Sequence, residues 1–333
     1  MSNVLSPLSE LKLLITGVNG FLGSEIVRQA IDLRLHVRAT DKQKISIFPD
    51  IDYHSADILD LSSLKPVVQG VSCVIHVAGL AHIFDKTKAA NAPFKEINEI
   101  GTVNVVQAAA NAGVKHFILI SSVSVYGPFT RGIYDESAPC SPEGKYAESK
   151  YQSEQRAIEI AQKSGMALTI LRLATLYGEG DPGNVARLMK AIDRGRFVWV
   201  GNGSNRKSLL YKGDAALAVL AIVSSPASGI NIYNVSAPPC AMREVVEGLA
   251  SAQGRRLPTW HIPASLILSV AKMVAAATGG RGRMGNLPAT LQKWLADDAY
   301  SAGKFEKAFN FQTQTSLAEG LRREVEWYRG KGK

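Results

Sequence analysis

Apolar runs and helical segments alternate along the first half of the chain. Short runs with the character of buried strands occur at residues 12–16, 36–40, 73–79, 116–122 and 167–174. Between them, residues 22–33 and 101–113 repeat apolar positions with helical spacing, and one more helical stretch precedes the last run. Apolar strands separated by helices predict an α/β fold, in which helices cover both faces of a doubly wound parallel sheet.

The alternation loosens beyond about residue 180, where helices and loops with Gly and Pro follow one another. The most apolar stretch there, residues 262–278, is shorter than a bilayer-spanning helix, and Pro263 and Lys272 interrupt it. We therefore expect a buried or surface-seeking amphipathic helix and no stable membrane span. Peripheral contact with a membrane stays open.

Composition places the chain among globular proteins, since 46% of its 333 residues are hydrophobic and 20% are charged. The three cysteines, Cys73, Cys140 and Cys240, lie far apart without CxxC spacing. This spacing argues against a disulfide framework and a zinc site, and we expect no bound metal. The first apolar run is too short for a secretory signal, so we expect a cytoplasmic protein.

Charge is distributed unequally between the two halves. Residues 1–165 hold 16 Lys and Arg against 17 Asp and Glu, whereas residues 166–333 hold 22 against 12. The basic residues are scattered, and no zinc-finger, basic-zipper or ribonucleoprotein pattern accompanies them, which argues against nucleic acid as a partner. A phosphorylated small-molecule substrate or an anionic membrane surface would explain the excess.

Three glycines, Gly17, Gly20 and Gly23, stand between the first strand and the first helix. Without side chains, a backbone can approach a pyrophosphate there, while the helix N-terminus offers N–H groups and a positive dipole. A tight turn without a ligand is the alternative. Asp41, at the end of the next strand, favours a dinucleotide with free ribose hydroxyls, and hence NAD over NADP, although Lys42 and Lys44 follow closely.

The segment YAESK places Tyr146 and Lys150 four residues apart in a helical stretch, and therefore on one face. A phenol becomes a base near neutral pH when neighbouring positive charges lower its pKa. Ser121 and Ser122 end the strand HFILI, at the edge where parallel sheets bind their ligands. Together these residues indicate acid–base chemistry at that edge.

In order and spacing, TGVNGFLG, Asp41, HVAG, SSVSVYG and YAESK resemble the extended short-chain dehydrogenase/reductase family of the NAD-dependent epimerase/dehydratase type. Residues 98–102 and the segment LRLATLYGEGD are similar to two further motifs of that family. The resemblance implies a Rossmann-like NAD-binding domain over residues 1–180. It also implies a smaller, mainly substrate-binding lobe over residues 181–333, with some segments returning to the sheet, and a homodimer.

The same resemblance implies roles for single residues. Ser122 would hold the substrate oxygen, Tyr146 would be the general acid/base, and Lys150 would bind the nicotinamide ribose and lower the tyrosine pKa. The residues implied to contact NAD are Gly17, Asn19, Gly20, Phe21, Leu22, Gly23, Asp41, Asp57, Ile58, Val77, Ala78, Gly79, Tyr146 and Lys150.

One departure from the family pattern narrows the reaction. Dehydratases of the family carry an acidic pair after the active-site Ser or Thr, and the related decarboxylases carry a glutamate in that turn. This chain has Val123 and Ser124 instead. Alcohol oxidation, ketone reduction, or both in sequence as an epimerase are the reactions that remain.

Most candidate substrate contacts lie in the second half of the chain. Lys207 and Asp214 match the spacing at which nucleotide-sugar enzymes place a basic residue on the diphosphate, and Arg206 is a neighbouring candidate. Ser124 and Thr175 are further candidates, although many relatives have Asn where Thr175 stands. The favoured interpretation is a nucleotide-sugar 4-epimerase or 4-ketoreductase. A 3β-hydroxysteroid dehydrogenase-like enzyme and a non-catalytic NAD-binding regulator stay open as alternatives.

Overall fold

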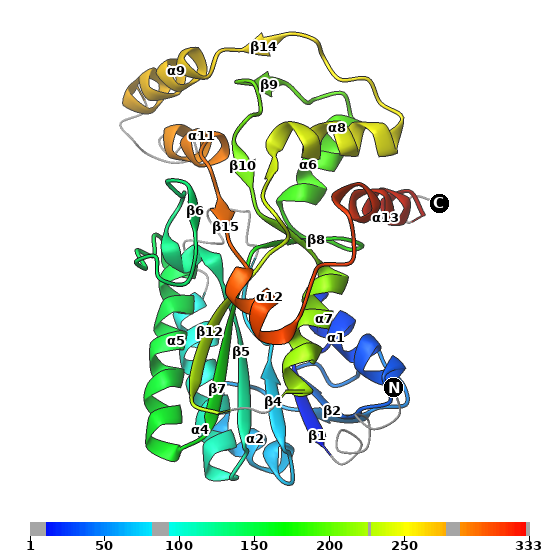
Figure 1. Cartoon of the computed structure of the whole chain (residues 1–333), viewed down its shortest axis with the longest axis vertical. Helices are drawn as coiled ribbons and strands as arrows, with labels where there is room; N and C mark the ends of the chain where they lie inside the picture. Colours follow the sequence, from blue (N-terminus) through cyan, green and yellow to red (C-terminus); the bar gives the residue numbers. More distant parts are fainter. Residues whose placement is uncertain (1–10, 82–92, 226–227, 278–286, 331–333) are drawn as a thin grey trace.

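The structure is a computed structural model that describes residues 11–81, 93–225, 228–277 and 287–330 (Figure 1). Seven parallel strands form its central sheet, in the order β12-β7-β5-β4-β1-β2-β3. They are β1 (Lys12–Thr16), β2 (His36–Asp41), β3 (Asp52–Ser55), β4 (Cys73–His76), β5 (His116–Ser122), β7 (Ala167–Leu173) and β12 (Ile230–Val235). The order reverses between β1 and β4, which confirms the predicted doubly wound, Rossmann-like sheet.

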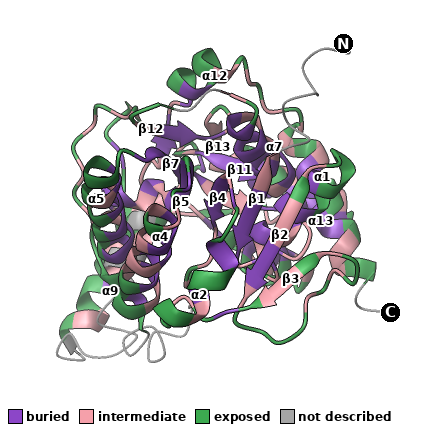
Figure 2. Cartoon of the chain, turned by 90° about the horizontal axis from the view of Figure 1, so that it is seen from below, coloured by how far each residue is buried: buried purple, intermediate pink, exposed green. Residues whose placement is uncertain are grey.

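Helices cover both faces of this sheet (Figure 2). One face carries α1 (Phe21–Asp32) and α7 (Lys212–Val223), and the other carries α2 (Leu61–Val68), α4 (Gly101–Asn111) and α5 (Lys145–Ser164). Two short helices lead into the site, the π-helix η1 (Lys95–Ile100) and the 3₁₀-helix η2 (Val123–Tyr126).

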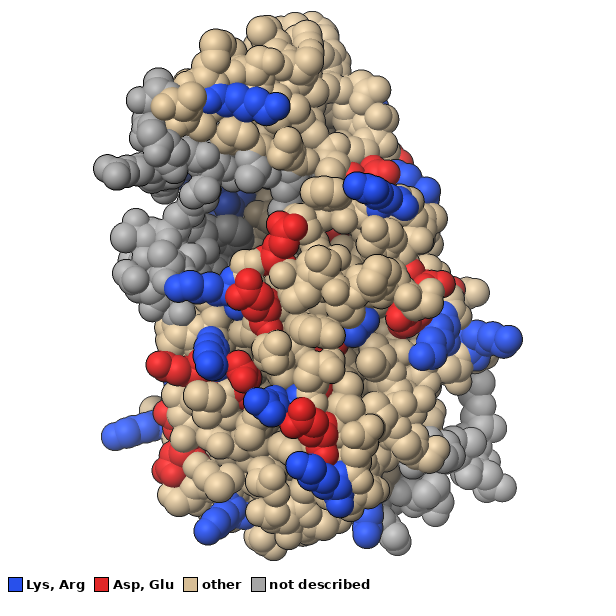
Figure 3. All heavy atoms as spheres, turned by 90° about the vertical axis from the view of Figure 1, so that its left-hand side faces the viewer, with Lys and Arg blue, Asp and Glu red and all other residues tan. Residues whose placement is uncertain are grey.

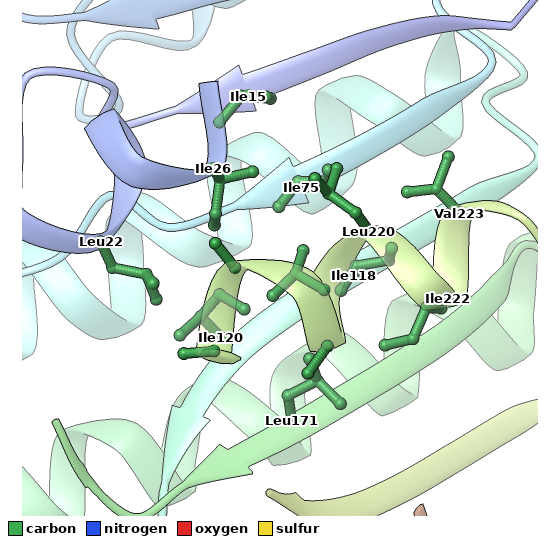
Figure 4. Packing of buried hydrophobic residues seen from close by; sticks show 14 of the residues in the cluster. Ile15, Leu22, Ile26, Ile75, Ile118, Ile120, Leu171, Leu220, Ile222 and Val223 are labelled. Carbon is green, nitrogen blue, oxygen red and sulfur yellow. The ribbon is translucent and has the colours of Figure 1, made fainter. Parts of the chain in front are cut away.

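Apolar side chains of the strands and helices interlock between these layers. Figure 4 shows Ile15, Ile118 and Leu171 of the strands against Ile26 of α1 and Leu220 of α7. All five are 3% exposed or less, so the core fixes the positions of the strand ends that carry the motif residues.

The second half of the chain contributes to the sheet as well as to a lobe. β12 pairs with β7, and α12 (Gly303–Phe309) packs against β12. In the lobe, α6 (Asn184–Asp193), α8 (Met242–Gln253) and α13 (Leu317–Gly330) enclose an apolar core of their own. Short strands link these parts: β6 (Ile133–Tyr134), β8 (Thr175–Tyr177), β9 (Trp199–Val200), β10 (Arg206–Lys207), β11 (Leu209–Tyr211), β13 (Cys240–Ala241), β14 (His261–Ile262) and β15 (Ala299–Tyr300).

The helix predicted in the apolar segment at 262–278 is present over residues 264–277, whereas Ile262 belongs to β14. This helix is α9 (Ala264–Ala277), which packs against α11 (Leu287–Leu295) at the end of the molecule away from the sheet (Figure 1); Thr278 lies outside the described residues. Within the described part of the chain, every helix is too short or too polar to cross a membrane. The three cysteines form no disulfide.

Candidate active site

A cavity of about 660 Å³ lies at the carboxyl ends of the parallel strands. Most residues of the predicted set line it, namely Gly17, Gly20, Phe21, Leu22, Gly23, Asp41, Asp57, Ile58, Val77, Ala78, Gly79, Ser122, Ser124, Tyr146, Lys150 and Thr175. The second half adds Pro182, Asn184, Asp298 and Tyr300. Among the predicted residues, Asn19, Arg206 and Lys207 do not line this cavity.

Two of the three glycines in the turn after β1 are required because other backbone atoms approach them closely. Gly17 has φ +71°, and a Cβ added there would lie 2.7 Å from the Cα of Ala78. A Cβ on Gly23 would lie 2.1 Å from the Gly17 carbonyl oxygen. Gly20 begins α1 with no side-chain cap, so the N–H groups of the first turn, at the cavity, suit an anion. The turn therefore fits a pyrophosphate, and two of its glycines also shape the turn.

Asp41 lies at the cavity and is held by backbone N–H groups. Its carboxylate accepts hydrogen bonds from Asn19 N (3.2 Å) and Gln43 N (3.3 Å). The Asn19 side chain donates to the Ile45 carbonyl at 3.1 Å and accepts from Ile47 N at 3.1 Å. Asn19 thus ties the glycine turn to the loop after β2, and this explains why it is absent from the cavity wall.

The structure brings Ser122, Tyr146 and Lys150 into the same cavity. The Ser122 hydroxyl accepts a hydrogen bond from Ser124 N at 3.2 Å. Burial raises the pKa of Tyr146, and the neighbouring Ser122 hydroxyl opposes this. The Lys150 ammonium donates to the Ile120 carbonyl at 2.5 Å, and burial lowers its pKa to about 8. Burial, and not Lys150, therefore has the largest effect on the phenol in this structure.

A buried histidine that the sequence did not single out supports the cofactor side of the cavity. His76 lies 2.8 Å through Nδ1 from the Thr16 hydroxyl and 3.1 Å through Nε2 from that of Thr102. Burial lowers the pKa of His76 to about 3, so the ring is neutral. Because the Thr16 oxygen also accepts from Val77 N and Ala78 N at 3.1 Å each, this network positions the strand end that lines the cavity.

Asn98 links the cavity wall to α5, the helix that carries Tyr146 and Lys150. From η1, its amide bonds both the N–H (2.6 Å) and the carbonyl (3.0 Å) of Leu80, and donates to the Ser149 hydroxyl at 3.0 Å. Ser149 in turn donates to the Tyr146 carbonyl at 2.8 Å. The motif at residues 98–102, which begins with Asn98, therefore positions α5.

A buried ion pair stands behind the site. Glu154 accepts from Arg172 Nη2 at 2.7 Å and from the Ser121 hydroxyl at 2.5 Å. Arg172 also donates to the Tyr126 hydroxyl at 3.0 Å. These bonds join α5, β5, β7 and η2, and so hold Ser122 in register with Tyr146 and Lys150 of α5.

The turn after Ser122 contains no acidic residue, and it contains one hydroxyl, that of Ser124, without a hydrogen-bond partner among the described residues. In η2, the Val123 side chain and the Ser124 hydroxyl oxygen are both buried. Because Ser124 lines the cavity, its hydroxyl is available to a ligand.

The predicted substrate anchors of the second half have other contacts in this structure. Lys207 Nζ donates to the Ala296 carbonyl at 2.8 Å, and Arg206 N donates to the Asp297 carboxylate at 2.7 Å. Asp214 is buried, and its carboxylate accepts from Gln314 N and Thr315 N at 3.0 Å each. Asp214 therefore fixes the segment before α13.

The model of the NAD dependent epimerase/dehydratase family matches residues 13–236, more than half of the chain. The chain belongs to this family. The predicted family and the predicted NAD dependence are thereby confirmed, and the protein is an NAD-dependent enzyme of the epimerase/dehydratase family.

Individual relatives cover three quarters of the chain or more. An N-acetyl-α-D-glucosaminyl-diphospho-ditrans,octacis-undecaprenol 4-epimerase of Escherichia coli O157:H7 is 29% identical over 94% of each chain. A UDP-glucose 4-epimerase of Vibrio cholerae is 28% identical over 75% of this chain and 78% of its own. The solved structure of MoeE5 in complex with UDP-glucose and NAD has the same fold, with a TM-score of 0.76 at 24% identity over 97% of this chain and all of its own.

Proposed function

We propose that this protein is a 4-epimerase of a sugar joined to its carrier through a diphosphate. The observation that carries the proposal is the joining of Ser122, Tyr146 and Lys150 in a cavity whose adjoining turn offers Val123 and Ser124. This set can move a proton on a sugar hydroxyl, and the turn lacks the acid that elimination needs. The two 4-epimerases among the relatives support the proposal.

The proton is moved at the Tyr146 hydroxyl. A substrate oxygen within reach of both Ser122 and Tyr146 receives a hydrogen bond from Ser122 and exchanges its proton with the phenol. Lys150, with a pKa lowered to about 8 by burial, lies one helical turn from Tyr146. Its positive charge would favour the phenolate and so oppose the burial that raises the pKa of the phenol. When bound, NAD supplies hydride acceptance and return at the sugar carbon.

NAD would be held by the motif residues of the first half. The uncapped N-terminus of α1 would bind the pyrophosphate, and Asp41 would accept hydrogen bonds from the adenosine ribose. Asp57 and Ile58 would flank the adenine, and the wall at Val77–Gly79 would lie along the cofactor.

The sugar would contact the buried Ser124 hydroxyl and Thr175, which both line the cavity. Lys207, with Arg206 beside it, would hold the diphosphate. The nucleotide, the homodimer and the cytoplasmic location stay predictions from the sequence.

The test is incubation of the purified protein with UDP-glucose, UDP-N-acetylglucosamine and a short-chain polyprenyl diphosphate carrying N-acetylglucosamine, with inversion at C4 followed by NMR. Tyr146→Phe should lower turnover at least ~100-fold with NAD affinity retained. A 4-ketoreductase would instead consume added reduced cofactor. Formation of a 4-keto-6-deoxy sugar, or oxidation of a sterol with no turnover of any sugar diphosphate, would contradict the proposal.

A further inference from the structure

A row of apolar side chains is exposed along α9. Leu266, Val270 and Met273 follow the spacing i, i+4, i+7, so they share one face of the helix. Their exposed fractions are 56%, 44% and 64%, whereas Ala271, on another face, is buried. We call these three residues the apolar stripe. Contiguous exposed apolar residues of this kind mark interaction sites.

The chain around the apolar stripe contains basic residues and no acidic ones. From residue 248 to residue 296 there is no Asp or Glu, and the cations are Arg255, Arg256, Lys272, Arg281, Arg283 and Lys293. On the side of the molecule shown in Figure 3, the described side chains at the upper end are basic or uncharged, and acidic ones begin below it. Trp260, which is 56% exposed, stands just before β14 in the same part of the lobe.

We propose that the apolar stripe of α9 docks on an anionic membrane surface. Apolar side chains on one face, nearby Lys and Arg, and an exposed Trp are the features of helices that lie in a lipid interface. Lys272, which is exposed on the same helix, would complement acidic headgroups while the stripe enters the acyl boundary, whereas Arg255 is already paired with Asp193. A symmetric contact through the apolar stripe would instead bring Lys272 of one copy close to Lys272 of the other, and residues 248–296 supply no acid between them.

The docking face adjoins the candidate active site through α11. This helix packs on α9 and ends at Leu295, and Asp298, three residues later, lines the cavity. The junction is braced, since Asn205 Nδ2 donates to the Trp294 carbonyl at 2.9 Å. A docked membrane would therefore lie beside the lobe that contributes to the cavity. Presentation of a lipid-borne substrate from that surface rests on the proposed function, whereas the docking itself does not.

The experiment is flotation of the full chain with vesicles of phosphatidylcholine alone or of phosphatidylcholine with phosphatidylglycerol. We expect binding to the anionic vesicles that weakens with salt. The double variant Leu266→Gln/Met273→Gln should lower the partition coefficient at least tenfold, and Lys272→Glu should weaken binding to anionic vesicles only. The matched control is Ile31→Gln/Leu33→Gln, which removes two exposed apolar side chains at the end of α1 and should change nothing.

Three results would overturn the proposal. The wild-type chain could fail to float with anionic vesicles, or the stripe variant could float as the wild type does. The stripe variant could also abolish a dimer in sedimentation velocity while wild-type vesicle binding is absent, and the face would then be an interface between copies. NAD affinity, measured in every variant, shows that the fold is retained and is independent of turnover.

Discussion

The sheet half and the lobe meet at one cavity but contribute to it in different ways. The sheet half brings its motif residues to one edge because the carboxyl ends of parallel strands converge there. The lobe adds Asp298 and Tyr300, which no motif indicated, while the motif residues Arg206 and Lys207 lie outside the lining. The cavity lining from the sheet half thus follows from topology, whereas the lining from the lobe depends on how irregular segments pack.

The two parts also differ in how they bury a carboxylate. Glu154, in the sheet half, is fully buried against the Arg172 guanidinium. Glu324, in α13 of the lobe, is 1% exposed; burial, followed by the charge of Asp181, raises its pKa to about 8. The sheet half therefore contains a buried ion pair that orders the edge of the sheet at the cavity. The lobe contains a buried carboxyl whose neutral form makes the folded state most stable.

The largest effect on stability is expected when the buried ion pair of Glu154 and Arg172 is broken. Glu154→Gln leaves the buried Arg172 charge without its counter-ion and should lower the free energy of unfolding by about 3–5 kcal/mol in denaturant titrations. The control is Glu159→Gln in the same helix, where the pair with Arg156 is half exposed and should contribute ~0.5 kcal/mol. Equal losses in the two variants would contradict the role given to the buried pair.

In the lobe, we expect the buried carboxyl of Glu324 to make the protein less stable as the pH rises. Its pKa rises from 4.5 to about 8 on folding, so the native state holds the extra proton and stability falls as the pH rises between these values. Glu324→Gln should reduce the difference in unfolding free energy between pH 5 and pH 8 by ~3 kcal/mol. Glu326→Gln, exposed in the same helix, should leave that difference unchanged. An unchanged pH slope in the Glu324 variant would count against a neutral buried carboxyl.

The same contrast explains what the sequence could predict. Apolar runs predicted β1, β4, β5 and β7 because buried parallel strands carry such runs. β3, with the sequence DYHS at the sheet edge, has no such run and was not predicted. His76 stood in a predicted strand and in the HVAG motif, but no role was predicted for it, since its bonds to Thr16 and Thr102 join residues distant in the chain. The contacts of Lys207 likewise depend on the distant Ala296.

A smaller effect is expected on the choice between NAD and NADP when Asp41, which lines the cavity, is substituted. Asp41→Asn removes the negative charge that would repel a 2′-phosphate, and Lys42 lines the cavity beside it. The ratio of NADP to NAD dissociation constants should fall ~10-fold, through tighter NADP binding and weaker NAD binding. Titration of both cofactors measures this ratio. A wild type that binds NADP as tightly as NAD would sink the assignment and point to Lys42.

The smallest effect, and the one that bears most on the lobe, is expected at Lys207. Its ammonium already donates to the Ala296 carbonyl, so a diphosphate would gain a contact that is partly committed to the chain. Lys207→Ala should weaken UDP binding ~3-fold at low salt, with a smaller loss at moderate salt, because exposed charges are screened. Arg206→Ala, at an exposed position, should lose less. If Lys207 only braces the junction before Asp298, the affinity lost in Lys207→Ala should not depend on salt. The loss should then also be equal for UDP and for uridine, which lacks the diphosphate. A salt-dependent loss confined to UDP would place the diphosphate at this edge of the lobe, where motif spacing alone first suggested it.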